Sequence, residues 1–222
     1  MTKTVSFVAT MPLPRVSTSA LACLLLFVMV SVLVVTGVTH DLDRQALQVV
    51  GPLRNPVATT IMRGASWIGD WMGEVPLLLL IAGLVWLRGR RNSAWRYLAL
   101  AVSGEVVWAI AKLLFHRPRP TIITRLGGAG WYSYPSGHAT LAPVIWGFGL
   151  VLLAQLVDSR PVKRVLWTLA VAIPILVAVS RLYLGVHYPT DVLGGLALGV
   201  GWVLVWHVSV SAPTPGGSTR SS

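Results

Sequence analysis

The chain has 222 residues, of which 55% are hydrophobic and only 11% are charged. A soluble globular domain usually carries about 25% charged residues, so this composition argues against a soluble fold and favours a membrane protein. The formal net charge is +11, but the basic residues form no single long patch and no base-stacking module is evident, so we do not expect nucleic-acid binding. The single cysteine, Cys23, excludes an intrachain disulfide and a cysteine-rich metal site.

Six apolar segments are candidates for membrane-spanning helices, which need about 20 mostly apolar residues each. In chain order they cover residues 20–38, 75–87, 97–115, 139–157, 165–184 and 192–210. The first segment is long for the apolar part of a signal peptide and no clear cleavage site follows it, so we expect an uncleaved helix. The second segment is short, and we expect residues 67–73 to extend it across the bilayer, or the helix to be tilted.

Apolar residues between the first two spans repeat at helical spacing, which predicts a helix lying at the membrane interface. They are Leu42, Ala46, Leu47, Val50 and Leu53. The sequence therefore predicts an all-α, polytopic membrane protein with six transmembrane helices in a bundle and this interfacial helix between the first two. We expect one membrane domain over residues 20–210, a cytoplasmic N-terminus over 1–19, and a disordered cytoplasmic tail over 211–222 that is rich in Ser, Thr, Pro and Gly.

The loops after the second and fourth spans contain most of the basic residues that indicate which side of the membrane is cytoplasmic. Their basic residues are Arg88, Arg90, Arg91, Arg96, Arg160, Lys163 and Arg164. Six spans place both termini and both of these loops on one side, and the positive-inside rule makes that side cytoplasmic. The segment 115–138 on the opposite side is also basic, so its charges call for a functional explanation.

Three short segments bring polar residues to span ends on this opposite side. They cover residues 112–120, 135–138 and 180–191. Charged residues at membrane depth are costly and usually face a site or a partner. A dianionic phosphate is a partner that the three cations Lys112, Arg119 and Arg181 could satisfy jointly.

The second segment starts the fourth span. Ser136 is a good N-cap candidate, and the free amides at a helix N-terminus bind phosphate. Gly137 would allow the phosphate to approach the backbone closely. His138 would then stand beside the phosphate, where it could give or take a proton.

The third segment contains a second histidine, His187, four residues before Asp191. A carboxylate at this spacing can orient an imidazole and support its positive charge, and a histidine held in this way can attack phosphorus. Each feature alone is ordinary, because a lone cation at a helix end is usually an interfacial anchor. Their conjunction on one membrane face indicates a phosphate site, although spacing alone leaves open which histidine attacks.

Together the three segments resemble the signature of the type-2 phosphatidic acid phosphatase family, whose fold is shared with vanadium haloperoxidases. That signature reads Lys-x6-Arg-Pro, then Pro-Ser-Gly-His, then Ser-Arg-x5-His-x3-Asp. Every specified position is met, in order, between Lys112 and Asp191. The resemblance implies a helical bundle with its site at the outer face of the membrane.

The resemblance also implies a role for each motif residue. His187 would be the nucleophile that forms a phosphohistidine, His138 the acid that protonates the leaving oxygen, and Asp191 the partner of His187. The phosphate would be held by Lys112, Arg119, Ser136, Gly137 and Arg181. No cluster of Cys, His and carboxylate residues has metal-ligand spacing, so we expect no metal and no other cofactor.

The expected function is thus that of an integral membrane phosphatase acting on a lipid phosphate or diphosphate. Undecaprenyl diphosphate, phosphatidylglycerol phosphate and phosphatidic acid are all candidate substrates, with a slight preference for the polyprenyl carrier. We expect a multi-pass protein of the cell inner (plasma) membrane with its site on the extracytoplasmic face. The partners are then the lipid substrate and the surrounding lipids, while the oligomeric state does not follow from the sequence.

Two other functions are weighed against this one. A vanadium haloperoxidase would use the same anion pocket, but those enzymes are soluble in the family picture. A non-catalytic lipid-phosphate binding or transport protein would not need both histidines. Three further residues stay open: His116 and Arg117 either contact substrate or sit at the interface, and Glu105, two turns before Lys112, either pairs inside the bundle or relays protons.

Overall fold

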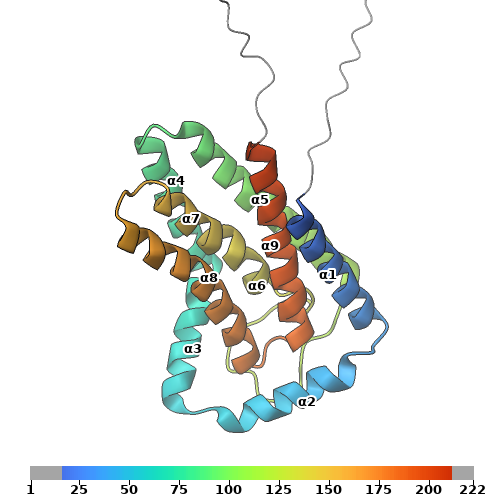
Figure 1. The fold of residues 1–222 in the computed structure, drawn as a ribbon. Coiled ribbons are helices and arrows are strands. Elements are labelled where there is room, and N and C mark those ends of the chain that lie inside the picture. The colour runs from blue at the N-terminus through green and yellow to red at the C-terminus, as the bar shows by residue number, and fades with distance from the viewer. Residues whose placement is uncertain (1–16, 212–222) are drawn as a thin grey trace, which may run out of the picture.

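The computed structural model describes residues 17–211, with side chains through residue 206, and every regular element in this range is a helix (Figure 1). The longer helices are α1 (Thr18–Val35), α2 (His40–Val50), α3 (Pro56–Ile68), α4 (Trp71–Leu87), α5 (Arg91–Phe115), α8 (Arg160–Tyr183) and α9 (Pro189–Ser211). The fourth predicted span consists of α6 (Gly137–Ala142), the π-helical η2 (Pro143–Gly147) and α7 (Phe148–Ala154), and a short 3-10 turn, η1 (Gly51–Leu53), follows α2. The expected tail, and all but the end of the expected N-terminus, lie outside the described residues.

Five of these helical segments are long and apolar enough to cross a membrane: α1, α5, the combined α6–α7 segment, α8 and α9. The pair α3 and α4 makes a sixth span if it is counted as one broken helix. An all-helical polytopic fold is therefore confirmed.

The second span includes part of the expected extension, because α4 begins at Trp71, while residues 67–70 belong to the end of α3 and the break after it. α3 and α4 meet at a bend of 50°. The break occurs where Gly69 ends α3 and the Asp70 carboxylate accepts a hydrogen bond from the backbone N–H of Met72. A Cβ atom at Gly69 would lie 2.3 Å from a methyl of Val177 on α8, so glycine permits the close contact at this bend. After the bend, α3 packs against α8 and continues towards α2 (Figure 1).

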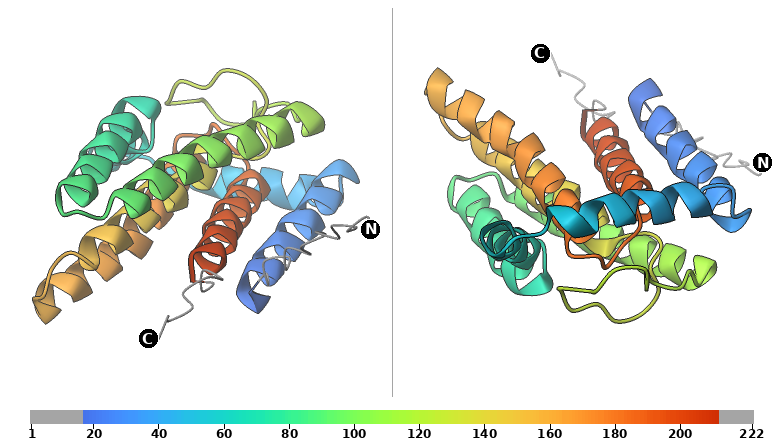
Figure 2. Two further views of the ribbon diagram at one scale, coloured as in Figure 1. Left: turned by 90° about the horizontal axis from the view of Figure 1, so that it is seen from above. Right: turned by 90° about the horizontal axis from the view of Figure 1, so that it is seen from below.

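The interfacial helix predicted after the first span is α2. It crosses one end of the bundle, between the end of α1 and the start of α3 (Figures 1 and 2). Leu47 on its apolar face is fully buried, but so is Asp43, whose carboxylate points into the protein. α2 therefore has a polar function inside the fold as well as an apolar one at the membrane surface.

The first residues of α1, the last turns of α9 and the connection from α4 to α5 lie at the end of the bundle opposite α2 (Figure 1). The α2 end holds the long segment between α5 and α6 and the short connection between α8 and α9. All three motif segments of the sequence consequently converge at the α2 end.

Close packing of α9 against α6 brings the second and third motif segments together. A Cβ atom at Gly195 would lie 2.7 Å from the carbonyl oxygen of Ser136, and one at Gly199 would lie 2.1 Å from that of Thr140. Small residues allow two helix backbones in a membrane to approach this closely. The start of α6 is thus held beside the start of α9.

Substitution of alanine at Gly199 should disrupt this packing. Because the added methyl would meet backbone rather than a movable side chain, we expect Gly199→Ala to destabilise the protein by about 1–3 kcal/mol, the usual cost of overpacking. The control is Gly83→Ala in α4, where a Cβ atom meets nothing within 4 Å. Thermal unfolding in detergent should show a lower Tm for Gly199→Ala only, and equal Tm values for the two variants would contradict the packing argument.

Candidate active site

The two histidines and three cations of the motifs lie around one site at the α2 end of the bundle. His187 belongs to the connection between α8 and α9 and is 2% exposed. Nη1 of Arg119, from the segment after α5, lies 3.1 Å from its Nε2 atom and 2.8 Å from the carbonyl oxygen of Val186. An arginine can only donate, so this contact requires that Nε2 carries a lone pair and that the hydrogen of the neutral imidazole resides on Nδ1. Nε2 is therefore the atom available for attack.

The electrostatic surroundings of His187 keep its imidazole neutral. Burial lowers the pKa of His187 to about 4, with Arg119 and Arg181 acting in the same direction and Asp191 opposing them. Protonation, which would occupy the lone pair on Nε2, then requires a pH below about 4. The imidazole is thus in its nucleophilic form throughout the physiological range.

Asp191 lies on the other side of this imidazole and is fully buried. One carboxylate oxygen, Oδ2, accepts hydrogen bonds from the Ser133 hydroxyl at 2.5 Å and the Tyr188 backbone N–H at 2.8 Å. The same oxygen lies 3.4 Å from Nδ1 of His187, within ion-pair range but without the alignment of a hydrogen bond. The structure thus places Asp191 beside His187, as expected, without a hydrogen bond between them.

Arg117 holds the second oxygen of Asp191, a role that the sequence did not reveal. Its guanidinium donates to Asp191 at 2.6 Å and to Asp43 of α2 at 2.6 Å, and it lies 4.2 Å from the ring centre of Tyr188. Burial lowers the pKa of Arg117, but the two carboxylates outweigh burial and raise it. Arg117 is thus part of an internal ion-pair network, which matches neither substrate contact nor simple interface placement. Asp43 is 74 residues away along the chain, so no local spacing could identify the pair.

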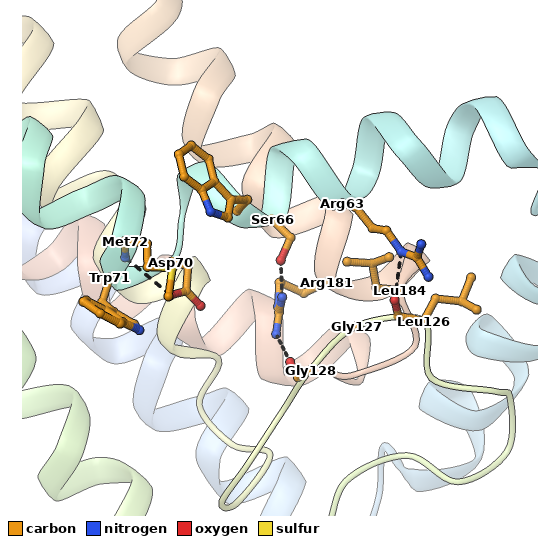
Figure 3. Close-up of a pocket in the computed structure, with 11 residues that line it drawn as sticks. Arg63, Ser66, Asp70, Trp71, Met72, Leu126, Gly127, Gly128, Arg181 and Leu184 are labelled. Atoms are coloured by element: carbon orange, nitrogen blue, oxygen red, sulfur yellow. Dashed lines mark hydrogen bonds between the residues drawn. The ribbon is translucent and has the colours of Figure 1, made fainter.

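The other two cations of the motifs are almost completely buried. Lys112, near the end of α5, donates to the carbonyl of Pro135 at 3.3 Å and lies 4.9 Å from the ring centre of Trp108. Arg181 of α8 donates to the hydroxyl of Ser66 on α3 and to the carbonyl of Gly128 at 3.4 Å (Figure 3). Neither has a carboxylate within ion-pair distance in the part of the chain that the structure describes.

Ser136 and Gly137 sit at the start of α6 as predicted, but with one difference. The Ser136 side chain is buried and accepts no capping hydrogen bond, so it remains available to a ligand. A Cβ atom at Gly137 would lie 2.8 Å from the ring of Trp108. A side chain at position 137 would therefore collide with Trp108. This is a second reason for glycine here, besides the close approach of phosphate expected from the sequence.

Unpartnered polar atoms mark the site. Buried atoms without a hydrogen-bond partner within residues 17–206 include four from predicted site residues: Ser136 Oγ, His138 Nε2, Arg181 Nε and His187 Nδ1. Each such atom usually costs about 1–3 kcal/mol, so native proteins contain few of them. His187 Nδ1 faces Asp191 and His138 Nε2 lies near Asp70, whereas Ser136 Oγ and Arg181 Nε have no such partner within the described residues and indicate a place that a polar ligand completes.

His138 also has an acidic neighbour, Asp70, which the sequence did not single out. Their Nε2 and Oδ2 atoms are 3.8 Å apart, which is within ion-pair range but too far for a hydrogen bond. Asp70 stands here because it caps α4 at the bend from α3. The irregularity in the second span thus places a carboxylate beside the second histidine.

Two adjoining cavities open onto these residues. The first, of about 490 Å³, has Arg181, Ser66, Arg63 and Gly128 in its wall (Figure 3). The second, of about 540 Å³, runs from His138 between α4 and α5 and is mostly apolar. Asp70 and Trp71 line both cavities. The site therefore has a polar side at the end of the bundle and an apolar side that extends along the helices. Within the described residues, no group of three or more His, Cys, Asp or Glu side chains could hold a metal ion.

Known proteins share both the sequence and the fold. Residues 93–214 match the family model described as PAP2 superfamily. Phosphatidylglycerophosphatase B of Bacillus subtilis (strain 168) is 29% identical over 181 residues, which cover 79% of this chain and 87% of that protein. The putative undecaprenyl-diphosphatase YbjG of Escherichia coli (strain K12) is 36% identical over 138 residues, 59% of this chain and 64% of that protein. Decaprenylphosphoryl-5-phosphoribose phosphatase of Mycobacterium tuberculosis is 34% identical over 143 residues, 62% of this chain and 72% of that protein.

The fold agrees with this assignment. The crystal structure of a transmembrane PAP2 type phosphatidylglycerolphosphate phosphatase from Bacillus subtilis superposes with a TM-score of 0.78 and covers 87% of this chain and 96% of that chain. At 24% identity this likeness concerns the arrangement of the helices. The family model, in contrast, matches more than half of the sequence, including all three motif segments. The chain belongs to the PAP2 superfamily and is a membrane phosphatase that acts on lipid phosphates.

Proposed function

We propose that the phosphatase reaction proceeds through a phosphohistidine on Nε2 of His187 and uses no metal. The observation that carries this proposal is the 3.1 Å contact from Arg119 to Nε2, which leaves the lone pair on the nitrogen that faces the phosphate ligands. Asp191 lies on the opposite side of the ring and supports the positive charge that develops during attack.

The first step is transfer of the phosphoryl group. Nε2 of His187 forms a bond to phosphorus while the bond from phosphorus to the lipid oxygen breaks, and His138 gives a proton to that oxygen. Lys112, Arg119 and Arg181 neutralise the phosphoryl oxygens, and the Ser136 hydroxyl and the amides at the start of α6 donate to them. These ligands come from three places: the end of α5 with the loop after it, the start of α6, and the end of α8.

The second step regenerates the enzyme. Water attacks the phosphohistidine, His138 takes a proton from that water, and the bond between Nε2 and phosphorus breaks. The products are inorganic phosphate and the free imidazole of His187. Asp70, whose Oδ2 atom lies 3.8 Å from Nε2 of His138, is the carboxylate beside the imidazole that gives and takes this proton.

The lipid part of the substrate would occupy the cavity between α4 and α5. Its wall includes Val75, Val102 and Val106, whose side chains are also exposed on the outside of the bundle, so the cavity opens sideways towards the surrounding lipid. A lipid could enter along the membrane without leaving it. This opening favours a lipid substrate over a small soluble phosphate ester.

A non-catalytic lipid-phosphate binding protein is the second candidate function. It would need the three cations and the amides of α6, but it would not need a histidine whose Nε2 carries a lone pair together with a second histidine. Both are present around one site. We therefore favour catalysis. A haloperoxidase is disfavoured by the membrane-spanning helices.

The proposed roles of the histidines predict different mutant phenotypes. His187→Ala removes the nucleophile, so no phosphoenzyme should form and no substrate should be hydrolysed. His138→Ala removes only the proton donor, which is typically worth about 10² to 10⁴-fold in rate. A nitrophenyl phosphate needs little protonation of its leaving group and should partly rescue His138→Ala, while Asp191→Asn should fall between the two variants.

The measurement is the initial rate on a lipid phosphate and on the nitrophenyl ester, together with trapping of an acid-labile phosphoenzyme by rapid quenching. Thermal unfolding in detergent should show that all variants are folded. Rescue of His187→Ala but not of His138→Ala would reverse the assignment of nucleophile and acid.

Activity should also be independent of metal ions. Three cations already surround the phosphate, so a strong chelator should leave the rate unchanged. Vanadate adopts the five-coordinate geometry of the transferring phosphorus and should inhibit. Complete loss of activity in chelator, with recovery on addition of magnesium, would rule out the mechanism proposed here.

We further propose that the site faces the extracytoplasmic side of the inner (plasma) membrane. The basic loop between α4 and α5 lies at the end of the bundle away from the site, as the positive-inside rule requires of a cytoplasmic loop. Reporter fusions placed after Ser211 and within residues 120–132 should report opposite sides, with the second fusion outside. The same side for both fusions would overturn this topology.

A further inference from the structure

Asp43 is a charged residue of the interfacial helix α2 that the proposed mechanism does not use. The neighbouring charged side chains of α2, Asp41 and Arg44, are exposed, whereas Asp43 is 1% exposed. Its ion-pair partner among the described residues is Arg117, at 2.6 Å. A carboxylate buried away from water is costly unless its charge and its hydrogen bonds are satisfied. Its burial on a helix that is otherwise amphipathic therefore calls for an explanation.

Both carboxylate oxygens of Asp43 are used. Oδ2 accepts hydrogen bonds from Nη2 of Arg117 and from the Thr190 hydroxyl, each at 2.6 Å, and Oδ1 accepts one from the Thr190 backbone N–H at 3.1 Å. Nη1 of Arg117 donates to the same hydroxyl at 2.8 Å and to Asp191 at 2.6 Å. Asp43 is thus connected to Asp191 by two routes, through the Arg117 guanidinium and through the start of α9.

The charges of this group matter for the imidazole beside it. Asp43 and Asp191 contribute two negative charges and Arg117 one positive charge, which leaves one net negative charge. All three side chains belong to residues that are at most 9% exposed, so salt screens them little. Without Asp43, Arg117 would neutralise Asp191. The imidazole of His187, whose Nδ1 atom is 3.4 Å from Asp191, becomes positive when Nε2 bonds to phosphorus and would then lose that compensation.

The geometry of the guanidinium leads to the same residue. A guanidinium is planar and its donors have fixed directions, so contacts with carboxylates on two sides determine its orientation. With Asp191 alone, Arg117 could rotate, and Asp191 would lose a fixed donor to one of its oxygens. A displacement of about 1 Å caused by a residue far from the reacting atoms can lower a rate about 10²-fold. Asp43 is therefore placed to affect the reaction without touching the substrate.

We propose that Asp43 is a positioning residue of the phosphatase reaction: through Arg117 and Thr190 it fixes Asp191 beside His187 and keeps a net negative charge for the imidazole. The proposal rests on the phosphohistidine mechanism proposed above and adds to it a residue that lies outside the three motif segments. It makes α2 a part of the catalytic apparatus as well as a contact with the membrane surface.

The first test is Asp43→Asn, which removes the charge and keeps the shape of the side chain. We expect kcat on a lipid phosphate to fall about 10-fold, as for loss of a hydrogen bond between charged groups. KM should stay the same, because the phosphate ligands are unchanged, and phosphoenzyme formation in a single turnover should slow by the same factor. The control is Asp41→Asn, which removes a charge from a side chain of α2 that is 90% exposed and should leave kcat unchanged.

The second test is a double-mutant cycle with Asp191→Asn, measured on the nitrophenyl ester. If Asp43 acts through Asp191, the two effects cannot add. Asp43→Asn should then change the rate of the Asp191→Asn enzyme by less than about 2-fold, although it slows the wild-type enzyme about 10-fold. A full 10-fold loss in both backgrounds would show that Asp43 acts independently of Asp191, and the proposal would be wrong.

A purely structural role has a different signature. It would lower the Tm and the amount of phosphoenzyme formed per mole of protein, but the rate per active site would remain that of the wild type. That result would also refute the proposal. If Asp43→Asn does not fold, Thr190→Val takes its place in the cycle, because it removes one donor to Asp43 and leaves all three charged residues in place. It should lower kcat about 3-fold in the wild-type background only.

The outcomes separate this inference from the proposed function. If the wild-type enzyme forms no phosphoenzyme, or if His187→Ala remains active, the phosphohistidine mechanism fails. If the phosphoenzyme forms but Asp43→Asn leaves kcat unchanged, or lowers it equally in both backgrounds, only the role of Asp43 fails.

Discussion

The buried carboxylate of Asp191 depends on three donors, and the arrangement of the site depends on that carboxylate. Ser133 and the Tyr188 backbone hold one oxygen, and Arg117 holds the other. A carboxylate out of contact with water is unfavourable unless its hydrogen bonds are satisfied in this way. Because its donors come from the segment before α6 and from the α8–α9 connection, stabilising this one charge also fixes those two segments beside His187.

The same network reaches the membrane surface through Arg117, whose second partner is Asp43 on α2. Asp43 in turn accepts hydrogen bonds from the backbone and side chain of Thr190 at the start of α9. Loss of Asp43 would therefore leave the Arg117 guanidinium with one carboxylate instead of two and release the start of α9 from α2. A residue on α2 consequently helps to position Asp191 beside His187 through Arg117.

The sequence predicted the helices and the motif residues well, because bilayer thickness fixes the length of an apolar span and because a three-part motif is seldom met by chance. It could not predict features that depend on contacts between distant segments. The bend at Gly69 follows from the approach of Val177, more than 100 residues later. The pairing of Arg117 with Asp43 likewise joins two segments that no local pattern connects. The roles of the motif residues in catalysis remain predictions.

The order of the site residues along the chain has a consequence for how the protein is made. Lys112, Arg117 and Arg119 enter the membrane region well before Asp191, which begins α9, the last described helix. Until that helix is inserted, Arg117 has Asp43 as its one carboxylate partner among the described residues, and the carboxylate beside His187 is missing. The arrangement around His187 is therefore completed only when α9 brings Asp191 to the α2 end of the bundle, so the helices made first wait for the last described one.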